Sequence, residues 1–120
     1  MILLVCGGRD FSDKEFIYNC LDSVKGKIDL IIEGGANGAD RIAREWAVSK
    51  GIHFATVEAL WGVYSNKAGP LRNKAMLMLK PDACVAFLGG TGTKSMVNLC
   101  NASSIKVWEP RQSQGRGKKL

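Results

Sequence analysis

Hydrophobic residues occur in five short runs that alternate with polar and amphipathic stretches of the chain. The first run, residues 2–6, is uninterrupted, which is typical of a β-strand buried on both faces of a sheet. The other runs are also rich in aliphatic residues, and polar or glycine-rich segments separate them. The pattern therefore predicts five strands, at residues 2–6, 28–32, 52–57, 83–87 and 105–108.

Four stretches between these runs repeat hydrophobic residues at intervals of three and four, the spacing of an amphipathic helix. The first follows residues 12–15, Ser-Asp-Lys-Glu, which we interpret as a capping box. Gly51 can end the second helix, and Pro70 and Pro81 bracket the third, because proline fits a first helical turn but not an interior. The fourth helix spans about residues 93–102.

This alternation of strands and helices predicts an α/β domain with a mostly parallel sheet covered by helices on both sides. In such a sheet the turns that follow the strands share the carboxyl edge, and ligands bind where the strand order reverses. If the first and fourth strands are neighbours at that point, their turns face one crevice. Residues 58–68 show no periodicity, and irregular segments of this length are often functional.

Glycine-rich turns follow three of the predicted strands. Glycine lacks a Cβ, so backbone N–H groups can approach a ligand closely, and the positive end of the next helix adds to the attraction for an anion. Thr91 and Thr93 add hydroxyl donors. We expect the turn at residues 89–93 to bind a phosphate. The ligand-binding residues that we predict in and beside these turns are Gly7, Gly8, Arg9, Gly34, Gly35, Asp40, Gly89, Gly90, Thr91, Gly92 and Thr93.

Several side chains near these turns extend the predicted site. Arg9 can donate to a phosphate in a bidentate manner, although a salt bridge to Asp10 or Asp40 would also explain it. For Asp40 itself we favour structural support of the turn or of the helix start.

Arg72 and Asn73 lie near the start of the third helix, where their donors could complete the anion site. Trp61 could stack on a nucleobase or simply cover the edge of the core, and the sequence favours neither role over the other.

Composition favours one small domain. The chain has 120 residues, 46% of them hydrophobic, and a net charge of +6, of which residues 110–120 contribute +4 and residues 1–109 only +2. We therefore predict a domain at residues 1–109 and a basic, disordered tail at residues 110–120 that could contact nucleic acid. Neither a membrane span nor a signal peptide is recognisable, so we expect a cytoplasmic protein.

Other kinds of chemistry receive little support. The cysteines, Cys6, Cys20, Cys84 and Cys100, lack the spacing of a metal or redox motif, and we interpret them as reduced core residues. His53 is the only histidine and lies in a predicted strand. We therefore expect no metal, no cofactor and no nucleophilic triad, and the missing G-K-[ST] ending disfavours a nucleotide triphosphatase.

Four motifs together resemble the SLOG superfamily, especially its small stand-alone YspA-like branch. They are GGRDF at residues 7–11, GGANGAD at 34–40, AGPLRN at 68–73 and GGTGT at 89–93. The resemblance covers residues 1–108 and implies a Rossmann-like three-layer fold that recognises nucleotides or nucleotide-derived ligands such as ADP-ribose. It also implies a bacterial or phage source and a homodimer or higher homo-oligomer.

More distant relatives on this resemblance are the Lonely Guy phosphoribohydrolases, which cleave the N-glycosidic bond of nucleoside monophosphates and carry a P-G-G-x-G-T-x-x-E motif. Here Leu88 precedes the glycines, and Met96 stands at the position of the glutamate, while Arg72 could correspond to the family's active-site arginine. Hydrolysis would therefore need another acid, and the catalytic candidates are Asp10, Glu33 and Asp40.

The leading hypothesis is a domain that binds or senses a phosphorylated nucleoside derivative, which would allow it to sequester a signalling nucleotide. The first alternative is an N-glycosidic hydrolase of nucleoside monophosphates. The second is single-stranded nucleic-acid binding, since residues 34–40 also resemble a turn of the DNA-processing protein A family. The nearly balanced charge of residues 1–109 counts against that second alternative.

Overall fold

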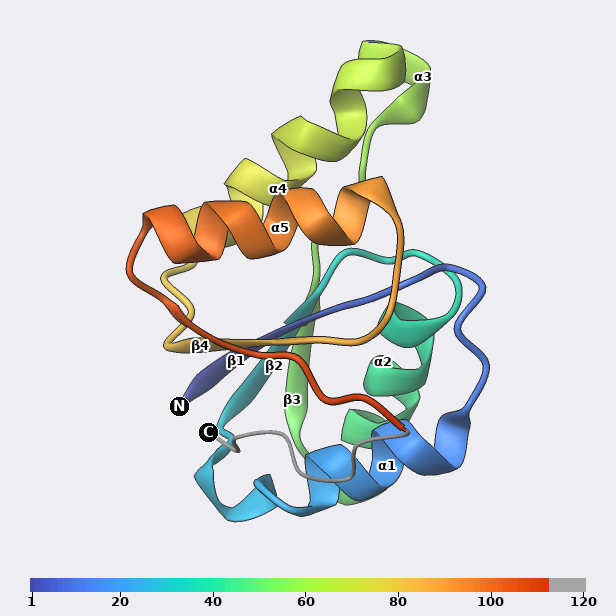
Figure 1. Ribbon diagram of the computed structural model, residues 1–120, viewed down its shortest axis with the longest axis vertical. Helices are drawn as coiled ribbons and strands as arrows, with labels where there is room; N and C mark the ends of the chain where they lie inside the picture. The colour runs from blue at the N-terminus through green and yellow to red at the C-terminus, as the bar shows by residue number, and fades with distance from the viewer. Residues whose placement is uncertain (113–120) are drawn as a thin grey trace.

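A computed structural model describes residues 1–112, which form an α/β domain with a five-stranded parallel sheet (Figure 1). The strand order is β3-β2-β1-β4-β5, and every neighbouring pair is parallel. Short 3-10 turns occupy Lys25–Lys27 and Ser65–Lys67. The strands and helices are β1 (Ile2–Cys6), α1 (Lys14–Asp22), β2 (Leu30–Glu33), α2 (Ala39–Lys50), β3 (His53–Thr56), α3 (Trp61–Tyr64), α4 (Ala68–Met78), β4 (Ala83–Ala86), α5 (Thr91–Ala102) and β5 (Lys106–Trp108).

Helices cover the sheet on both sides, which confirms the predicted three-layer, Rossmann-like arrangement (Figure 1). Along β1, Leu3 and Val5 pack with α1 and α2, whereas Leu4 and Cys6 pack with α4 and α5. Because both faces of this central strand are buried, its sequence shows no alternation between hydrophobic and polar residues.

The strand order reverses at β1, which pairs with β2 on one side and with β4 on the other. The first and fourth strands are therefore neighbours, which is the condition under which their turns were expected to face one crevice. Backbone hydrogen bonds continue beyond the two strands, from Phe87 N–H to the Cys6 carbonyl (2.9 Å) and from Gly8 N–H to the Leu88 carbonyl (3.0 Å). These bonds hold the turns after β1 and β4 side by side at the carboxyl edge.

Two local predictions differ from the structure. The N-cap of α1 is Asp13, whose Oδ1 accepts from Phe16 N–H at 3.0 Å, so the predicted capping box starting at Ser12 is wrong. The segment 58–68 is not wholly irregular, because it contains α3, a 3-10 turn and, at Ala68, the start of α4, whose first turn includes Pro70 as predicted. Helix α3 has only four residues and buries none of them, so it leaves no periodic hydrophobic pattern in the sequence.

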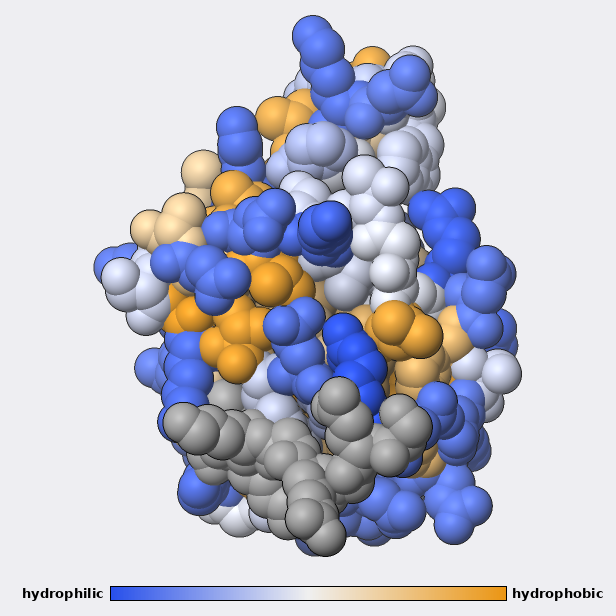
Figure 2. Space-filling view, viewed as in Figure 1, coloured by the Kyte–Doolittle hydropathy of each residue, from blue (hydrophilic) through white to orange (hydrophobic). Residues whose placement is uncertain are grey.

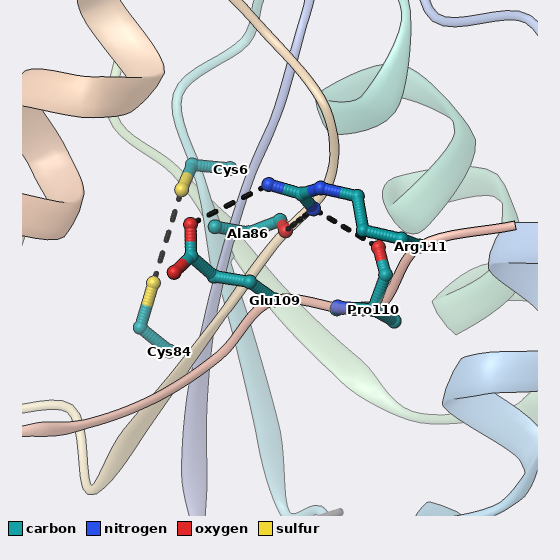
Figure 3. Close-up of polar contacts among 6 residues, drawn as sticks. All are labelled: Cys6, Cys84, Ala86, Glu109, Pro110 and Arg111. Atoms are coloured by element: carbon teal, nitrogen blue, oxygen red, sulfur yellow. Dashed lines mark hydrogen bonds and ion pairs between the residues drawn. The ribbon is translucent and has the colours of Figure 1, made fainter. Parts of the chain in front are cut away.

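Three of the cysteines lie in the core on the side of the sheet covered by α4 and α5. Cys6 and Cys84 have their sulfur atoms 3.8 Å apart (Figure 3). Hydrogen bonds to Cys100 and Cys6, together with burial, raise the pKa of the Cys84 thiol well above its ordinary value. Cys20 is half-buried against the opposite side of the sheet.

The described C-terminal residues fold back against the end of β4 (Figure 3). Strand β5 pairs with β4 only as far as Val85, and the Arg111 guanidinium then donates to the Ala86 carbonyl at 3.2 Å. The same guanidinium donates to the Pro110 carbonyl at 3.0 Å and lies 3.5 Å from the Glu109 carboxylate. Arg111 therefore donates a hydrogen bond to β4 just beyond the last residue that β5 pairs with.

Residues 113–120, which hold most of the predicted basic tail, lie outside the described residues, so the tail and its boundary stay predictions. Within residues 1–112, no helix has the length and hydrophobicity to cross a membrane.

Figure 2 shows hydrophobic residues gathered over α5 and beside the edge strand β5. Partly buried side chains in this part of the fold include Val97, Ile105 and Val107.

Candidate functional site

A cleft of about 580 Å³ opens at the carboxyl edge of the sheet, where the strand order reverses. The turns after β1 and β4 and the first turn of α5 form most of its wall, and α4 closes another side. The lining residues are Cys6, Gly7, Gly8, Arg9, Asp10, Phe11, Ala36, Asp40, Arg72, Asn73, Met76, Leu88, Gly89, Gly90, Thr91, Gly92, Thr93 and Met96. Most of the side chains and glycines that the sequence assigned to a phosphate site therefore lie around one cleft.

The three glycine-rich turns touch one another through their backbones. The Gly8 carbonyl accepts from Ala39 N–H at 3.2 Å, so the turn after β1 contacts the start of α2. Gly38 has a φ of +76° and no room for a side chain, because a Cβ there would overlap the Gly8 carbonyl oxygen. A Cβ on Gly89 would lie 2.6 Å from the Gly8 nitrogen. Glycine at these positions is what allows the turns to converge.

The N-terminus of α5 presents unpaired amides to the cleft. Its N-cap is Gly90, which has no side chain to cap the helix, and the Gly90 carbonyl accepts from Lys94 N–H at 3.1 Å. The amides of Thr91, Gly92 and Thr93 precede that bond and have no carbonyl one turn earlier to receive them. Together with the helix dipole they make this edge of the cleft attractive to an anion.

Arg72 and Asn73 connect the cleft walls. The Arg72 Nη1 donates to the Gly34 carbonyl at 2.6 Å, and its Nε donates to Asn73 Oδ1 at 3.1 Å. Asn73 is buried and its Nδ2 donates to the Gly92 carbonyl at 3.3 Å. Helix α4 thus ties the turn after β2 to α5, and no hydrogen bond within residues 1–112 uses Nη2 of Arg72.

Asp40 is a buried carboxylate with one bonded and one unbonded oxygen. Its Oδ2 accepts from Gly34 N–H (3.2 Å) and Ala36 N–H (3.3 Å), so it holds the turn after β2 in shape. Its Oδ1 is buried and has no hydrogen-bond partner among the described residues, although Asp40 lines the cleft.

The surroundings of Asp40 shift its pKa to about 6. Burial is the main cause of the increase, and the nearby Glu33 carboxylate adds to it. The Ala36 and Gly34 amides and the Arg72 guanidinium oppose it. The carboxyl group therefore changes its protonation state close to neutral pH.

The remaining acids have different surroundings. Asp10 is exposed at the rim of the cleft, next to Arg9. Arg9 is also exposed, and within residues 1–112 it forms no salt bridge with Asp10 or Asp40, so the alternative explanation for Arg9 is not borne out. Glu33 is fully buried, accepts from Gly35 N–H at 2.7 Å and from the Thr56 hydroxyl, and does not line the cleft.

A second cavity of about 370 Å³ adjoins the cleft. The two share Arg9, Ala36 and Arg72 in their linings. Gly34, Gly35 and Trp61 line this second cavity and not the main cleft. Asn37, Glu58 and Ala59 complete its lining.

Glu58, Ala59 and Asn37 line the second cavity although they are not among the predicted ligand-binding residues. The available signal was that Glu58 begins the segment 58–68, just after the predicted third strand and therefore at the same carboxyl edge.

Comparison with known proteins decides the family. Residues 1–64 match the family described as "YspA, cpYpsA-related SLOG family", and this match covers more than half of the chain. The chain belongs to this family. The match includes the first two glycine-rich turns, Trp61 and Glu58, whereas the turn after β4 lies outside it. The predicted SLOG resemblance is therefore confirmed.

A curated phage protein is similar to this chain over nearly its whole length. The chain is 29% identical over 119 residues to the gene 61 protein of Mycobacterium phage D29, and the alignment covers 88% of this chain and 92% of that protein. This SLOG-family protein therefore has a phage relative of similar length. Membership of a SLOG family is consistent with nucleotide-related binding or hydrolysis.

Proposed function

We propose that this SLOG-family protein binds a phosphorylated nucleoside derivative, such as a nucleotide or an ADP-ribose-like molecule. The main support is the convergence of three glycine-rich turns and two arginines, Arg9 and Arg72, around one cleft. In this proposal the phosphate lies against the amides of residues 91–93 at the N-terminus of α5. The guanidinium groups neutralise its charge.

The arrangement of donors favours an anion over a neutral ligand. Backbone amides, the Thr91 and Thr93 hydroxyls and the Asn73 amide all come from segments that line the cleft. Arg9 has no salt bridge within residues 1–112, and Nη2 of Arg72 has no hydrogen bond there, so both retain donors for a ligand. The second cavity, which shares both arginines, gives the rest of a nucleotide a place next to its phosphate.

Isothermal titration calorimetry with AMP, ADP-ribose and ribose 5-phosphate tests this proposal. Arg9 is exposed and bonds to no other described group, so Arg9→Ala should leave the fold intact and weaken binding about ten- to hundredfold. Arg41→Ala is the matched control, because Arg41 is an exposed arginine of α2 that lines neither cavity. Absence of binding at millimolar ligand, or equal affinities in wild type and Arg9→Ala, would overturn the proposal.

Asp40 supports hydrolysis of the N-glycosidic bond as a second candidate function. Its Oδ1 is buried without a partner in the described part of the chain, it lines the cleft, and its pKa is about 6. A carboxyl group that titrates near neutral pH can exchange protons with a bound substrate. Met96, which replaces the glutamate of the Lonely Guy motif, is buried and cannot take this role.

Incubation with GMP and AMP, followed by chromatographic detection of free base and ribose 5-phosphate, distinguishes hydrolysis from binding. Under the hydrolase hypothesis, wild type releases base, Asp40→Asn does not, and Asp10→Asn retains activity if Asp40 is the acid. Binding of the nucleotide without release of base would exclude hydrolysis and leave the binding function in place.

A further inference from the structure

The second cavity lies where the nucleoside part of a phosphorylated ligand would extend. It shares Arg9 and Arg72 with the main cleft, so a ligand whose phosphate contacts these arginines lies next to both cavities. Its walls come from the turn after β2 and from the segment after β3. The amides at the N-terminus of α5 do not line it, so its chemistry differs from that of the main cleft.

Trp61 offers a flat hydrophobic surface in this cavity. Half of its side chain is exposed, which is unusual for a tryptophan that only completes a core. The ring lies against the start of α4, since a Cβ on Gly69 would be 3.3 Å from its Cη2 atom. An exposed indole that packs on a helix at one edge is suited to stacking with a nucleobase.

Glu58 places an acceptor in the same cavity. It is exposed and, within residues 1–112, forms neither a salt bridge nor a hydrogen bond, although Arg9 and Arg72 line the same cavity. Its side chain lies over Gly35, because a Cβ on that glycine would be 3.1 Å from Cγ and 3.4 Å from Oε1 of Glu58. The missing side chain of Gly35 therefore makes room for the glutamate in the cavity that Trp61 also lines.

We infer that the second cavity binds a guanine base, which stacks on Trp61 and donates two hydrogen bonds to Glu58; this inference rests on the proposed nucleotide-binding function. An ionised carboxylate only accepts hydrogen bonds. Guanine presents two adjacent donors, N1–H and the exocyclic amino group, which match both carboxylate oxygens. Adenine presents an unprotonated N1 beside its amino group, so its lone pair would face the carboxylate.

The other polar groups of the cavity do not reverse this preference. The Asn37 amide can donate or accept, so it can accommodate either purine. The two arginines lie at the boundary with the main cleft, where the phosphate binds in the proposed function. The vicinal hydroxyls of ribose also form a donor pair, but the indole ring that lines the same cavity favours a flat base over a sugar.

Calorimetric titration with GMP, AMP and ribose 5-phosphate measures the preference directly. We expect wild type to bind GMP at least about tenfold more tightly than AMP, the discrimination typical of one bidentate contact to a base. Glu58→Gln should bring the GMP to AMP ratio close to one and leave the affinity for ribose 5-phosphate unchanged. Trp61→Ala should weaken both nucleotides by roughly tenfold or more without affecting ribose 5-phosphate.

Two controls match these variants in chemistry and exposure. Glu45→Gln changes an exposed carboxylate of α2, and Tyr64→Ala removes an exposed aromatic of α3, and neither residue lines either cavity. Both controls should behave as wild type. Circular dichroism of each variant establishes that it is folded.

Different outcomes separate the inference from the proposed function. Equal affinity for GMP and AMP, with ribose 5-phosphate also bound, overturns the guanine assignment and leaves phosphate binding intact. Weak binding of 2′-deoxy-GMP with no purine preference would assign Glu58 to the ribose and overturn the inference. Failure of all three ligands to bind at millimolar concentration overturns both proposals.

Discussion

At the scale of single residues, Asp40 connects the shape of a turn with the chemistry of the cleft. One oxygen holds the amides of Gly34 and Ala36, while the other is buried in the cleft wall without a partner in the described part of the chain. A buried polar atom without a partner is destabilising unless a ligand or a proton satisfies it. Asp40 is therefore the residue whose state should respond most directly to pH and to ligand.

Asp40 should make the stability of the free protein depend on pH in a direction unusual for a carboxylate. Its pKa rises from 3.8 to about 6 on folding, so its contribution is fully present below pH 3.8 and is lost as the pH rises through about 6. The loss amounts to roughly 3 kcal/mol of unfolding free energy. Urea denaturation of wild type and of Asp40→Asn at several pH values between 4 and 7 gives the unfolding free energy of each protein. The difference between the two free energies should change by this amount over the pH range. Parallel pH profiles for the two proteins would contradict the prediction.

Gly89 should tolerate substitution far less well than its neighbour Gly90. A Cβ on Gly89 would press against the Gly8 backbone, whereas one on Gly90 would have nothing within 4 Å, and Gly90 has a φ of −94° that other residues adopt readily. Gly89→Ala should lower the unfolding free energy by about 1–3 kcal/mol and Gly90→Ala by less than about 0.5 kcal/mol. Similar denaturation midpoints for both variants would show that the turns are not in close contact.

At the scale of elements, the start of α1 tests which residue caps the helix. Asp13 accepts from Phe16 N–H, while Ser12 lies one residue too early. Asp13→Ala should therefore cost about 1 kcal/mol of unfolding free energy, Asp13→Asn should retain most of the capping, and Ser12→Ala should change stability by less than about 0.5 kcal/mol. Thermal unfolding of the three variants decides the question, and a larger effect at Ser12 would reinstate the capping box.

The sequence was most informative where elements are buried. The hydrophobic run at residues 2–6 predicts a central strand because both faces of β1 are covered, and the glycine pairs mark the turns that must approach closely. Alternating strands and helices also predict that the turns after the strands share one edge of the sheet, whereas the pairing of the first and fourth strands was only a condition that the structure meets. The buried strand and the close turns depend on burial and backbone geometry, which leave a strong local pattern.

Features that depend on contacts between distant segments could not be predicted in the same way. The bond from Arg72 to the Gly34 carbonyl joins residues 38 positions apart, and no local pattern marks it. Glu58 lines the second cavity only because β3 ends beside the turn after β2, and the exposed helix α3 carries no burial pattern. Such contacts can be identified only from the tertiary structure, because the type of a residue does not reveal which distant residue it will contact.

At the scale of the whole molecule, the expected homodimer stays a prediction that exposed hydrophobic side chains make testable. Met78 is 79% exposed at the end of α4, and Leu71 is also exposed on that helix. If apolar helix faces pair between two copies, Met78→Glu should raise the dissociation constant at least about tenfold, because a charge would be buried at the interface. Sedimentation equilibrium measures this change.

The control for this experiment is Val48→Glu, which alters an exposed hydrophobic residue of α2 on the other side of the sheet. It should leave the association unchanged if the α4 side forms the interface. Wild type that sediments as a monomer at tens of micromolar would refute the dimer prediction, and dissociation caused by Val48→Glu would move the interface to α2.

The division between backbone and side chains around the two cavities has an evolutionary consequence. Peptide groups of the glycine turns form the wall of the main cleft, whereas Glu58 and Trp61 supply distinctive side chains to the neighbouring cavity. Neither side chain forms a hydrogen bond with the interlocked turns in the described part of the chain, so a substitution at either position breaks none of the bonds that hold the turns together. If the second cavity selects the base as we infer, substitutions in this one surface segment can change the choice of ligand, while the glycine turns and the sheet beneath them stay the same.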